Sequence, residues 1–227
     1  MIKVMVFAKR RTGMTVEDFE AHWRSGHADL VRRQRSLARY VQNPTLRSAY
    51  QARGKSREPI YDGIAEAWFE NLAILHDLSK TAEFEAVRAD EAHFIDPATT
   101  FSLTVSEEII VDGPIPEPSV KMFAFLNKRS DKSVEFFQNY WREKHGPIAA
   151  LIPGNHRYVQ CHVRPELYRS SRSPKYDGIP ISWFENEDAL RASGTSAEFE
   201  ATRADECNFM APGRLPFVIA RGREIEL

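Results

Sequence analysis

The stretches "WRSGHADL" at residues 23–30 and "WREKHGPI" at residues 141–148 decide the fold, because one chain carries the pattern Trp-Arg-x-x-His twice. The two copies are 118 residues apart (141 − 23), and residues 2–43 align with residues 120–161 without a gap. A loop then shortens by three residues, after which "YDGIAEAWFEN" returns as "YDGIPISWFEN" and "EFEAVRADE" as "EFEATRADE" at an offset of 115. A period of this length is too long for a solenoid and predicts a duplicated small domain.

The joint between the two copies is "VDGPIPEPSV", which starts at residue 111 and contains three prolines and a glycine. Such a composition disfavours regular structure and suits an exposed connector. We therefore expect one repeat at residues 1–112, a Pro-rich linker at residues 113–119 and a second repeat at residues 120–227.

Composition excludes several classes of function. The chain has 227 residues with 31 Lys and Arg against 32 Asp and Glu, and this balance disfavours a nucleic-acid partner. No apolar run approaches the roughly 18–20 residues that span a bilayer, and the N-terminus lacks the order of a secretory signal. We expect a cytoplasmic protein without membrane contact. Cys161 and Cys207 form neither a metal pattern nor a disulfide framework.

Each copy predicts the element order β-α-β-β-α-β, which is the ferredoxin-like unit. Thr15 and Ser133 are suitable N-caps for the first helices. Each of these helices carries an apolar stripe at spacings of three and four residues, and the first comprises Val16, Phe19, Trp23, His27 and Leu30. One unit leaves a sheet face bare, so two units can bury these faces against each other. The predicted fold class is α+β, with two ferredoxin-like repeats forming an intramolecular dimeric α/β barrel, either as a monomer or as a further homodimer.

Taken together, several motifs resemble the EthD family of dimeric α/β-barrel proteins. They are a basic pair after the first strand, "S/T-V-E-x-F-x-x-x-W-R-x-x-H", "RYVQ", "YDG-I" followed by "WF", and "EFEA-x-RADE-x-x-F". The wider superfamily is similar in fold to muconolactone isomerases, polyketide aromatic cyclases, cofactor-free monooxygenases, and heme-binding peroxidases and chlorite dismutases. The resemblance therefore implies a fold, and it leaves the reaction open.

His27 and His145 are the first catalytic candidates, since each ends an apolar stripe one turn beyond a Trp. A His there suits proton transfer near neutral pH, whereas the alternative is a His that caps the helix end. Tyr40 and Tyr158, in "RYVQ", are expected to meet these histidines if their strand face points toward the helix. The alternative is a core Tyr with a single backbone partner.

The second half adds His156 and His162 around its "RYVQ", where the first half has Ala38 and Pro44. We therefore favour the second half as the site, with His145 as general acid/base, Tyr158 and His162 assisting, and His156 contacting substrate. Further candidate substrate contacts are Trp23, Trp68, Trp141, Trp183 and Asp177. The pattern favours core or barrel-seam positions for Trp68 and Trp183, and a turn for Asp177. The acids around Arg88 and Arg203 predict a salt-bridged helix face.

No His- or carboxylate-rich metal pattern and no Gly-rich phosphate loop occurs, and an axial heme His is not favoured. We expect neither a metal nor a cofactor. The sequence favours a cofactor-independent enzyme that shuffles protons on a small hydrophobic or aromatic metabolite, of the isomerase, cyclase, dehydratase or decarboxylase type. The alternatives are a cofactor-free monooxygenase and a non-catalytic binding or accessory protein.

Overall fold

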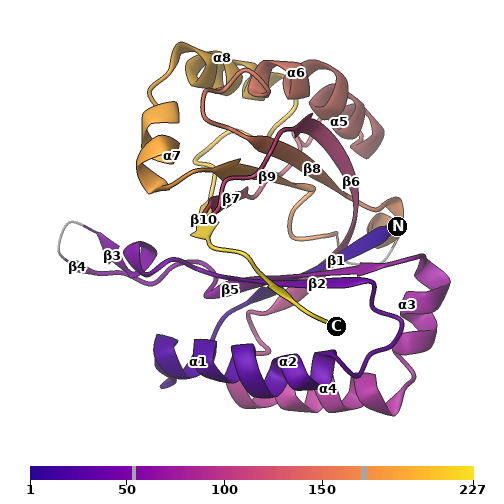
Figure 1. Ribbon diagram of the computed structural model, residues 1–227. Coiled ribbons are helices and arrows are strands. Elements are labelled where there is room, and N and C mark those ends of the chain that lie inside the picture. Colours follow the sequence, from indigo (N-terminus) through magenta and orange to yellow (C-terminus); the bar gives the residue numbers. More distant parts are fainter. Residues whose placement is uncertain (53–54, 170–172) are drawn as a thin grey trace. The chain divides into compact units, whose positions relative to one another are not determined.

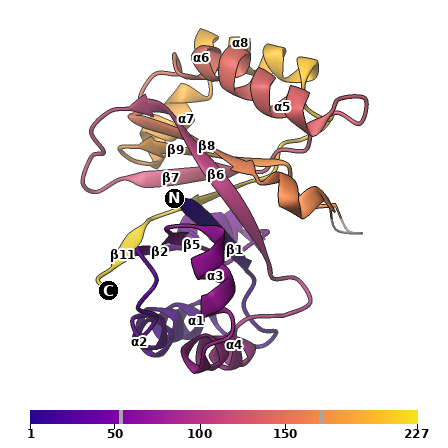
Figure 2. The same ribbon diagram turned by 90° about the vertical axis from the view of Figure 1, so that its right-hand side faces the viewer.

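The computed structural model describes residues 1–52, 55–169 and 173–227. The chain divides into two compact units. Unit 1 comprises Met1–Val105 and Ala220–Leu227, and unit 2 comprises Ser106–Ile219. Figures 1 and 2 show the elements of each unit. The predicted polar loop of the first repeat includes residues 53–54, which lie outside the described residues.

Unit 1 contains an antiparallel sheet in the order β6-β1-β5-β2-β11. Its strands are β1 (Ile2–Ala8), β2 (Arg39–Pro44), β5 (Gly63–Phe69), the start of β6 (Phe101–Asp112) and β11 (Arg223–Ile225). A separate two-stranded hairpin pairs β3 (Gln51–Ala52) with β4 (Lys55–Ser56). Leaving out β11, the order of the repeat's own strands is fourth, first, third, second, which is the ferredoxin-like arrangement.

The helices of unit 1 cover one face of this sheet (Figures 1 and 2). They are α1 (Val16–His22), η1 (Trp23–His27), α2 (Ala28–Val31), α3 (Leu72–Leu78) and α4 (Ala82–Phe94), with a short η2 (Arg47–Tyr50) in the loop. The predicted cap at Thr15 is confirmed, because its Oγ1 accepts a hydrogen bond of 3.0 Å from the N–H of Asp18. Phe19, Trp23 and Phe94 are buried between helices and sheet.

Unit 2 repeats this arrangement with the sheet order β10-β7-β9-β8-β6. Its strands are β7 (Val120–Ala124), β8 (Arg157–Val163), β9 (Gly178–Phe184), β10 (Phe217–Ala220) and the end of β6. Its helices are α5 (Val134–Tyr140), η3 (Trp141–His145), α6 (Gly146–Ala149), η4 (Pro165–Arg169), α7 (Glu187–Ser193), α8 (Ala197–Asp205) and η5 (Glu206–Asn208). The cap at Ser133 is confirmed by a 3.0 Å bond from the N–H of Phe136. The predicted α+β fold class with two ferredoxin-like repeats is confirmed. Each repeat has the strands and helices of half a dimeric α/β barrel.

The last strand of each repeat contributes to both units. β6 pairs with β1 through residues such as Val105, opposite Lys3, and its later residues lie beside β8. The second repeat ends as β10, beside β7, and then as β11, beside β2. The boundaries of the compact units therefore differ from those of the sequence repeats. The domain boundaries at residues 1–112 and 120–227 remain a prediction from the sequence.

The helix that carries Trp-Arg-x-x-His is interrupted in both units by a π-helical segment, η1 and η3. The sequence predicts a continuous α-helix here, because a π turn has no signature in apolar spacing. A strand glutamine supports each segment: Gln42 Nε2 donates to the Trp23 carbonyl at 2.7 Å, and Gln160 Nε2 donates to the Trp141 carbonyl at 2.8 Å. Such π segments are frequent at functional sites.

The glycine of "YDG" makes room for the tryptophan of this segment. A Cβ on Gly178 would lie 2.4 Å from Trp141 Cζ3, and one on Gly63 would lie 2.3 Å from Trp23 Cζ3. Each glycine is the first residue of its strand, β9 or β5. Its role is therefore close packing of a ring on the sheet, in addition to the turn chemistry that the Asp-Gly pair predicts.

Candidate functional site

Each unit contains a cavity between its helices and its sheet. The unit-2 cavity has a volume of about 390 Å³, whereas the unit-1 cavity has about 110 Å³. His145, Trp141 and Tyr158 line the first, and the equivalent His27, Trp23 and Tyr40 line the second. Both cavities have mainly apolar walls, formed by residues such as Phe184 and Leu190 in unit 2. In each unit, the cavity thus brings together the His and the Trp of the Trp-Arg-x-x-His motif and the Tyr of "RYVQ".

His145 is oriented by a carboxylate from α8. Its Nδ1 lies 2.9 Å from Oδ2 of Asp205, and the other carboxylate oxygen accepts hydrogen bonds of 2.8 Å from the Tyr140 hydroxyl and from Asn208 Nδ2. A carboxylate partner holds the proton on Nδ1, so Nε2 carries the lone pair. Because His145 lines the cavity, Nε2 is the ring nitrogen that remains for a ligand.

Burial sets the protonation of this pair. His145 is only 5% exposed, and burial lowers the pKa of its imidazole although Asp205 opposes the shift. Burial raises the pKa of Asp205, but hydrogen bonds from Tyr140, Asn208 and His145 outweigh it and leave that pKa below its ordinary value. At neutral pH the pair is therefore a neutral imidazole beside a carboxylate, which is the arrangement of a general base.

The Tyr158 hydroxyl accepts two hydrogen bonds, from Trp141 Nε1 at 3.1 Å and from Gln160 Nε2 at 3.2 Å. A phenolic oxygen with both acceptor positions used has only its own hydrogen left to donate. Burial raises the pKa of Tyr158 to about 12, so the hydroxyl keeps this hydrogen. Tyr158 is thus prepared to donate into the cavity. The expected Tyr–His hydrogen bond is replaced by these bonds, because the indole of Trp141 occupies the place beside the hydroxyl.

His162 lies behind this network and is not among the residues that line the unit-2 cavity. Its Nε2 lies 3.0 Å from Oε1 of Gln160, and its ring centroid lies 4.5 Å from that of Trp141. Burial, with a smaller contribution from the charge of Arg142, lowers the pKa of His162 to about 3. A neutral His162 donates from Nε2 to Gln160, so this placement favours a positioning role over direct contact with a substrate.

Unit 1 repeats the constellation in a smaller space. His27 Nδ1 lies 2.8 Å from Asp90, which also accepts from His22 Nε2 at 2.9 Å, and Trp23 Nε1 donates to the Tyr40 hydroxyl at 3.2 Å. Burial lowers the pKa of His27 and raises that of Tyr40 to about 12. The two units have the same kinds of side chains around the histidine, and they differ in the volume of the cavity, which is larger in unit 2.

Substitutions between the repeats change the size of lining residues in both directions, since Met122 and Leu126 are larger than their counterparts Val4 and Ala8. Other residues that line the unit-1 cavity have smaller counterparts in unit 2, and several apolar ones have polar counterparts. The smaller counterparts are Ala124 for Val6, Ala149 for Val31 and Ser193 for Leu78. The polar ones are Asn155 for Leu37, Ser182 for Ala67 and Thr202 for Val87.

The other predicted substrate contacts lie elsewhere. Since Ser182 and Phe184 line the cavity, strand alternation places Trp183 on the opposite sheet face, where Lys121 Nζ lies 5.2 Å from its ring. Trp68 is placed likewise in unit 1, with Lys3 Nζ at 4.8 Å.

Asp177 accepts from the Tyr168 hydroxyl at 2.7 Å and from the Lys128 N–H at 2.8 Å, so it holds two loops together. His156 precedes β8. Its backbone N–H donates a hydrogen bond to the Trp183 carbonyl, and its carbonyl accepts one from the N–H of Gly113. Neither residue lines the unit-2 cavity.

Asp205 and Asp90 are candidate site residues that the sequence did not single out. Both stand in the repeated "RADE", which predicts a salt-bridged surface. The predicted ion pairing is present, since Arg203 binds Glu206 at 2.5 Å. Asp205, which lies between these two residues in the sequence, instead contacts His145. The signal that was available is the retention of Asp at the same position in both copies.

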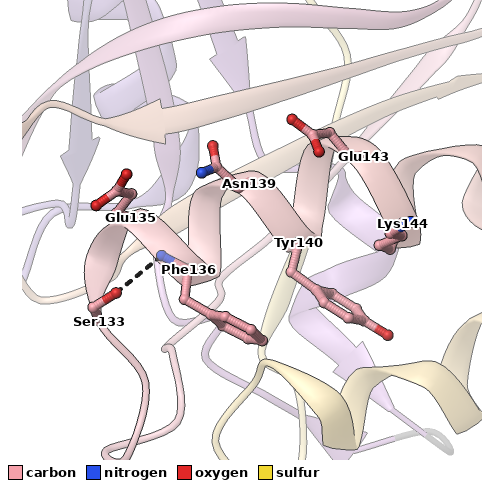
Figure 3. A pocket seen from close by; sticks show the side chains of 7 residues that line it. All are labelled: Ser133, Glu135, Phe136, Asn139, Tyr140, Glu143 and Lys144. Atoms are coloured by element: carbon pink, nitrogen blue, oxygen red, sulfur yellow. Dashed lines mark hydrogen bonds between the residues drawn. The ribbon is translucent and has the colours of Figure 1, made fainter.

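A further pocket lies along the outside of α5 and η3 (Figure 3). Glu135, Phe136, Glu143 and Lys144 there are exposed, and Figure 3 shows Phe136 and Tyr140 pointing to the same side of the helix. The charged side chains of this groove are exposed to solvent, whereas the histidine of the unit-2 cavity is buried, so the unit-2 cavity is the stronger candidate site.

Within the described residues, no helix combines the length and the apolar character needed to cross a lipid bilayer. In the same part of the chain, no three His, Cys, Asp or Glu side chains gather in a way that holds a metal ion.

Fold and cavities together define an α+β protein of two ferredoxin-like repeats, each with an apolar helix–sheet cavity. The family model of the EthD domain matches residues 11–98 and 129–213, and the chain belongs to this family. Among curated proteins no sequence matches it significantly.

Solved structures share the fold over nearly the whole chain. An anthrone oxidase-like protein has a TM-score of 0.66 at 9% identity and covers 100% of this chain and 93% of its own. A candidate monooxygenase from Fusobacterium nucleatum subsp. nucleatum has 0.59 at 8% identity, with 99% and 92% covered. A mutant chlorite dismutase from Candidatus Nitrospira defluvii has 0.53 at 11%, with 98% and 91% covered. Identities this low show a common fold alone.

Proposed function

We propose that the chain is a cytoplasmic, cofactor-independent enzyme that removes and returns a proton on a small hydrophobic, aromatic metabolite in the unit-2 cavity. The observation that carries this proposal is the Asp205–His145 pair, whose Nε2 is the nitrogen left for the cavity. A mainly apolar wall strengthens the interaction of such groups with a developing charge, because it lowers the local dielectric constant.

The chemistry assigns one role to each residue. His145 Nε2 takes a proton from an acidic C–H beside a carbonyl group, and the electron pair of that bond moves toward the carbonyl oxygen. Tyr158 donates its hydrogen to this oxygen as negative charge develops. Asp205 stabilises the imidazolium, which then returns the proton to another atom of the same substrate. Isomerisation, cyclisation and dehydration all use this sequence of steps.

Anthrone is a suitable probe, because its methylene protons are acidic through enolisation to an aromatic phenol. In D2O without oxygen, we expect the protein to accelerate exchange of these protons, and mass spectrometry measures the rate above the buffer background. His145→Gln should lower the accelerated rate by about 100-fold or more, the usual contribution of a general base. The matched control is His27→Gln in the smaller unit-1 cavity, which should leave the rate unchanged.

Three results contradict the proposal. Equal rates in the wild type and in His145→Gln remove His145 from the chemistry. Binding of anthrone without any accelerated exchange identifies a binding or accessory protein. Exchange that is absent until oxygen is admitted, with anthraquinone as product, identifies a cofactor-free monooxygenase.

A further inference from the structure

Two polar side chains meet on the wall of the unit-2 cavity, whose lining is mainly apolar but also includes charged residues such as Arg203 and Glu206. Asn155 precedes β8 and Ser182 lies within β9, and both line the cavity. Asn155 Nδ2 lies 3.3 Å from Ser182 Oγ. Asn155 is 9% exposed, and its Oδ1 is buried without a hydrogen-bond partner among the described residues.

The fold itself does not require this pair. The equivalent residues in unit 1 are Leu37 and Ala67, which line the smaller cavity with the same backbone arrangement. A buried acceptor without a partner destabilises a folded protein, so Asn155 Oδ1 needs another explanation at a position where unit 1 has a leucine. A ligand that supplies the missing donor is such an explanation.

We infer that Asn155 and Ser182 form a subsite that binds a hydroxyl group on an aromatic ligand and so selects hydroxylated aromatic compounds. The inference rests on the proposed function only in placing the ligand in the same cavity. A ligand hydroxyl donates its hydrogen to Asn155 Oδ1 and accepts from the amide or from the rotatable Ser182 hydroxyl. A carboxylate offers acceptors alone and would face Oδ1 with like partial charge, so it fits this subsite poorly.

The test compares 1-naphthol with naphthalene, which share the ring system and differ in one hydroxyl group. Equilibrium dialysis with the full-length protein measures both dissociation constants. We expect 1-naphthol to bind about tenfold more tightly, the preference that one neutral buried hydrogen bond supplies. Asn155→Leu, which installs the residue of unit 1, should remove this preference while naphthalene binding is retained. Ser182→Ala, made separately, should reduce it.

Retained naphthalene binding shows that a variant is folded around an intact cavity. Equal affinities for the two probes in the wild type, or an unchanged preference in Asn155→Leu, overturn the subsite. The binding preference and the proton exchange are measured separately. A protein that prefers 1-naphthol but never accelerates exchange therefore refutes the proposed reaction and leaves the subsite standing.

Discussion

Ser193→Leu offers a direct test of the unit-2 cavity, because the substitution installs the residue that unit 1 has at the equivalent position, Leu78. Both side chains line their cavities. The leucine should fill part of the 390 Å³ space and weaken the binding of 1-naphthol about tenfold or more through steric overlap. At the same time it should stabilise the fold.

The expected stabilisation follows from the groups exchanged. Leucine adds three carbons beyond Cβ, and burying them contributes about 2 kcal/mol at about 0.8 kcal/mol per CH2 group. The substitution removes the 2.8 Å hydrogen bond from Ser193 Oγ to the Leu190 carbonyl, which is worth about 1 kcal/mol. The free energy of unfolding should therefore rise by about 1 kcal/mol, as measured by urea unfolding.

The matched control is Leu78→Ser, which enlarges the unit-1 cavity. It should lower the free energy of unfolding by about 3 kcal/mol, as buried leucine truncations do, and it should leave naphthol binding unchanged. The reasoning is refuted if Ser193→Leu binds 1-naphthol as tightly as the wild type. It is refuted equally if the variant loses about 2 kcal/mol, since the cavity would then have no room for the added carbons.

Two further predictions concern the packing around Trp141. Gly178→Ala should lower the free energy of unfolding by about 1–3 kcal/mol or more, because the new Cβ would lie 2.4 Å from Trp141 Cζ3, and an unchanged urea midpoint would contradict this close approach. The pKa of His162 is lowered to about 3, whereas the unfolded chain binds this proton near its ordinary value of about 6.5. The unfolded state thus gains a proton first as pH falls, and the free energy of unfolding decreases from pH about 6.5 down to about 3. At pH 5 this decrease is about 2 kcal/mol. His162→Leu should remove that part of the pH dependence in urea unfolding measured from pH 7.5 to 5, and a pH slope identical to the wild type would show that folding leaves the pKa of His162 near its ordinary value.

The fold was accessible from the sequence because its signals are local and repeated. The predicted element order β-α-β-β-α-β is the order in which the main strands and helices of each repeat occur. Thr15 and Ser133 were recognisable as caps from residue type and position. Apolar spacing and caps act within a few residues, so the chain displays them before it folds.

The site was accessible only in part. The repeated Trp-Arg-x-x-His and "RYVQ" drew attention to His145, Tyr158 and Trp141, which do line one cavity. His162 was expected beside the substrate and instead bonds Gln160 behind the tyrosine. The partner of His145 was missed, because Asp205 is 60 residues away and its helix face carries charges that suggest solvent.

The sequence by itself determined that the chain is a duplication of one ferredoxin-like unit, because the same apolar and capping pattern occurs twice. Tertiary structure alone decided which histidine nitrogen remains for a ligand, which hydrogen bonds the tyrosine oxygen accepts and how large each cavity is. Those properties depend on side chains that meet across helix and strand, such as Asp205 with His145 and Trp141 with Tyr158. They depend equally on volume, which arises only when Ala124, Ala149 and Ser193 face the same space.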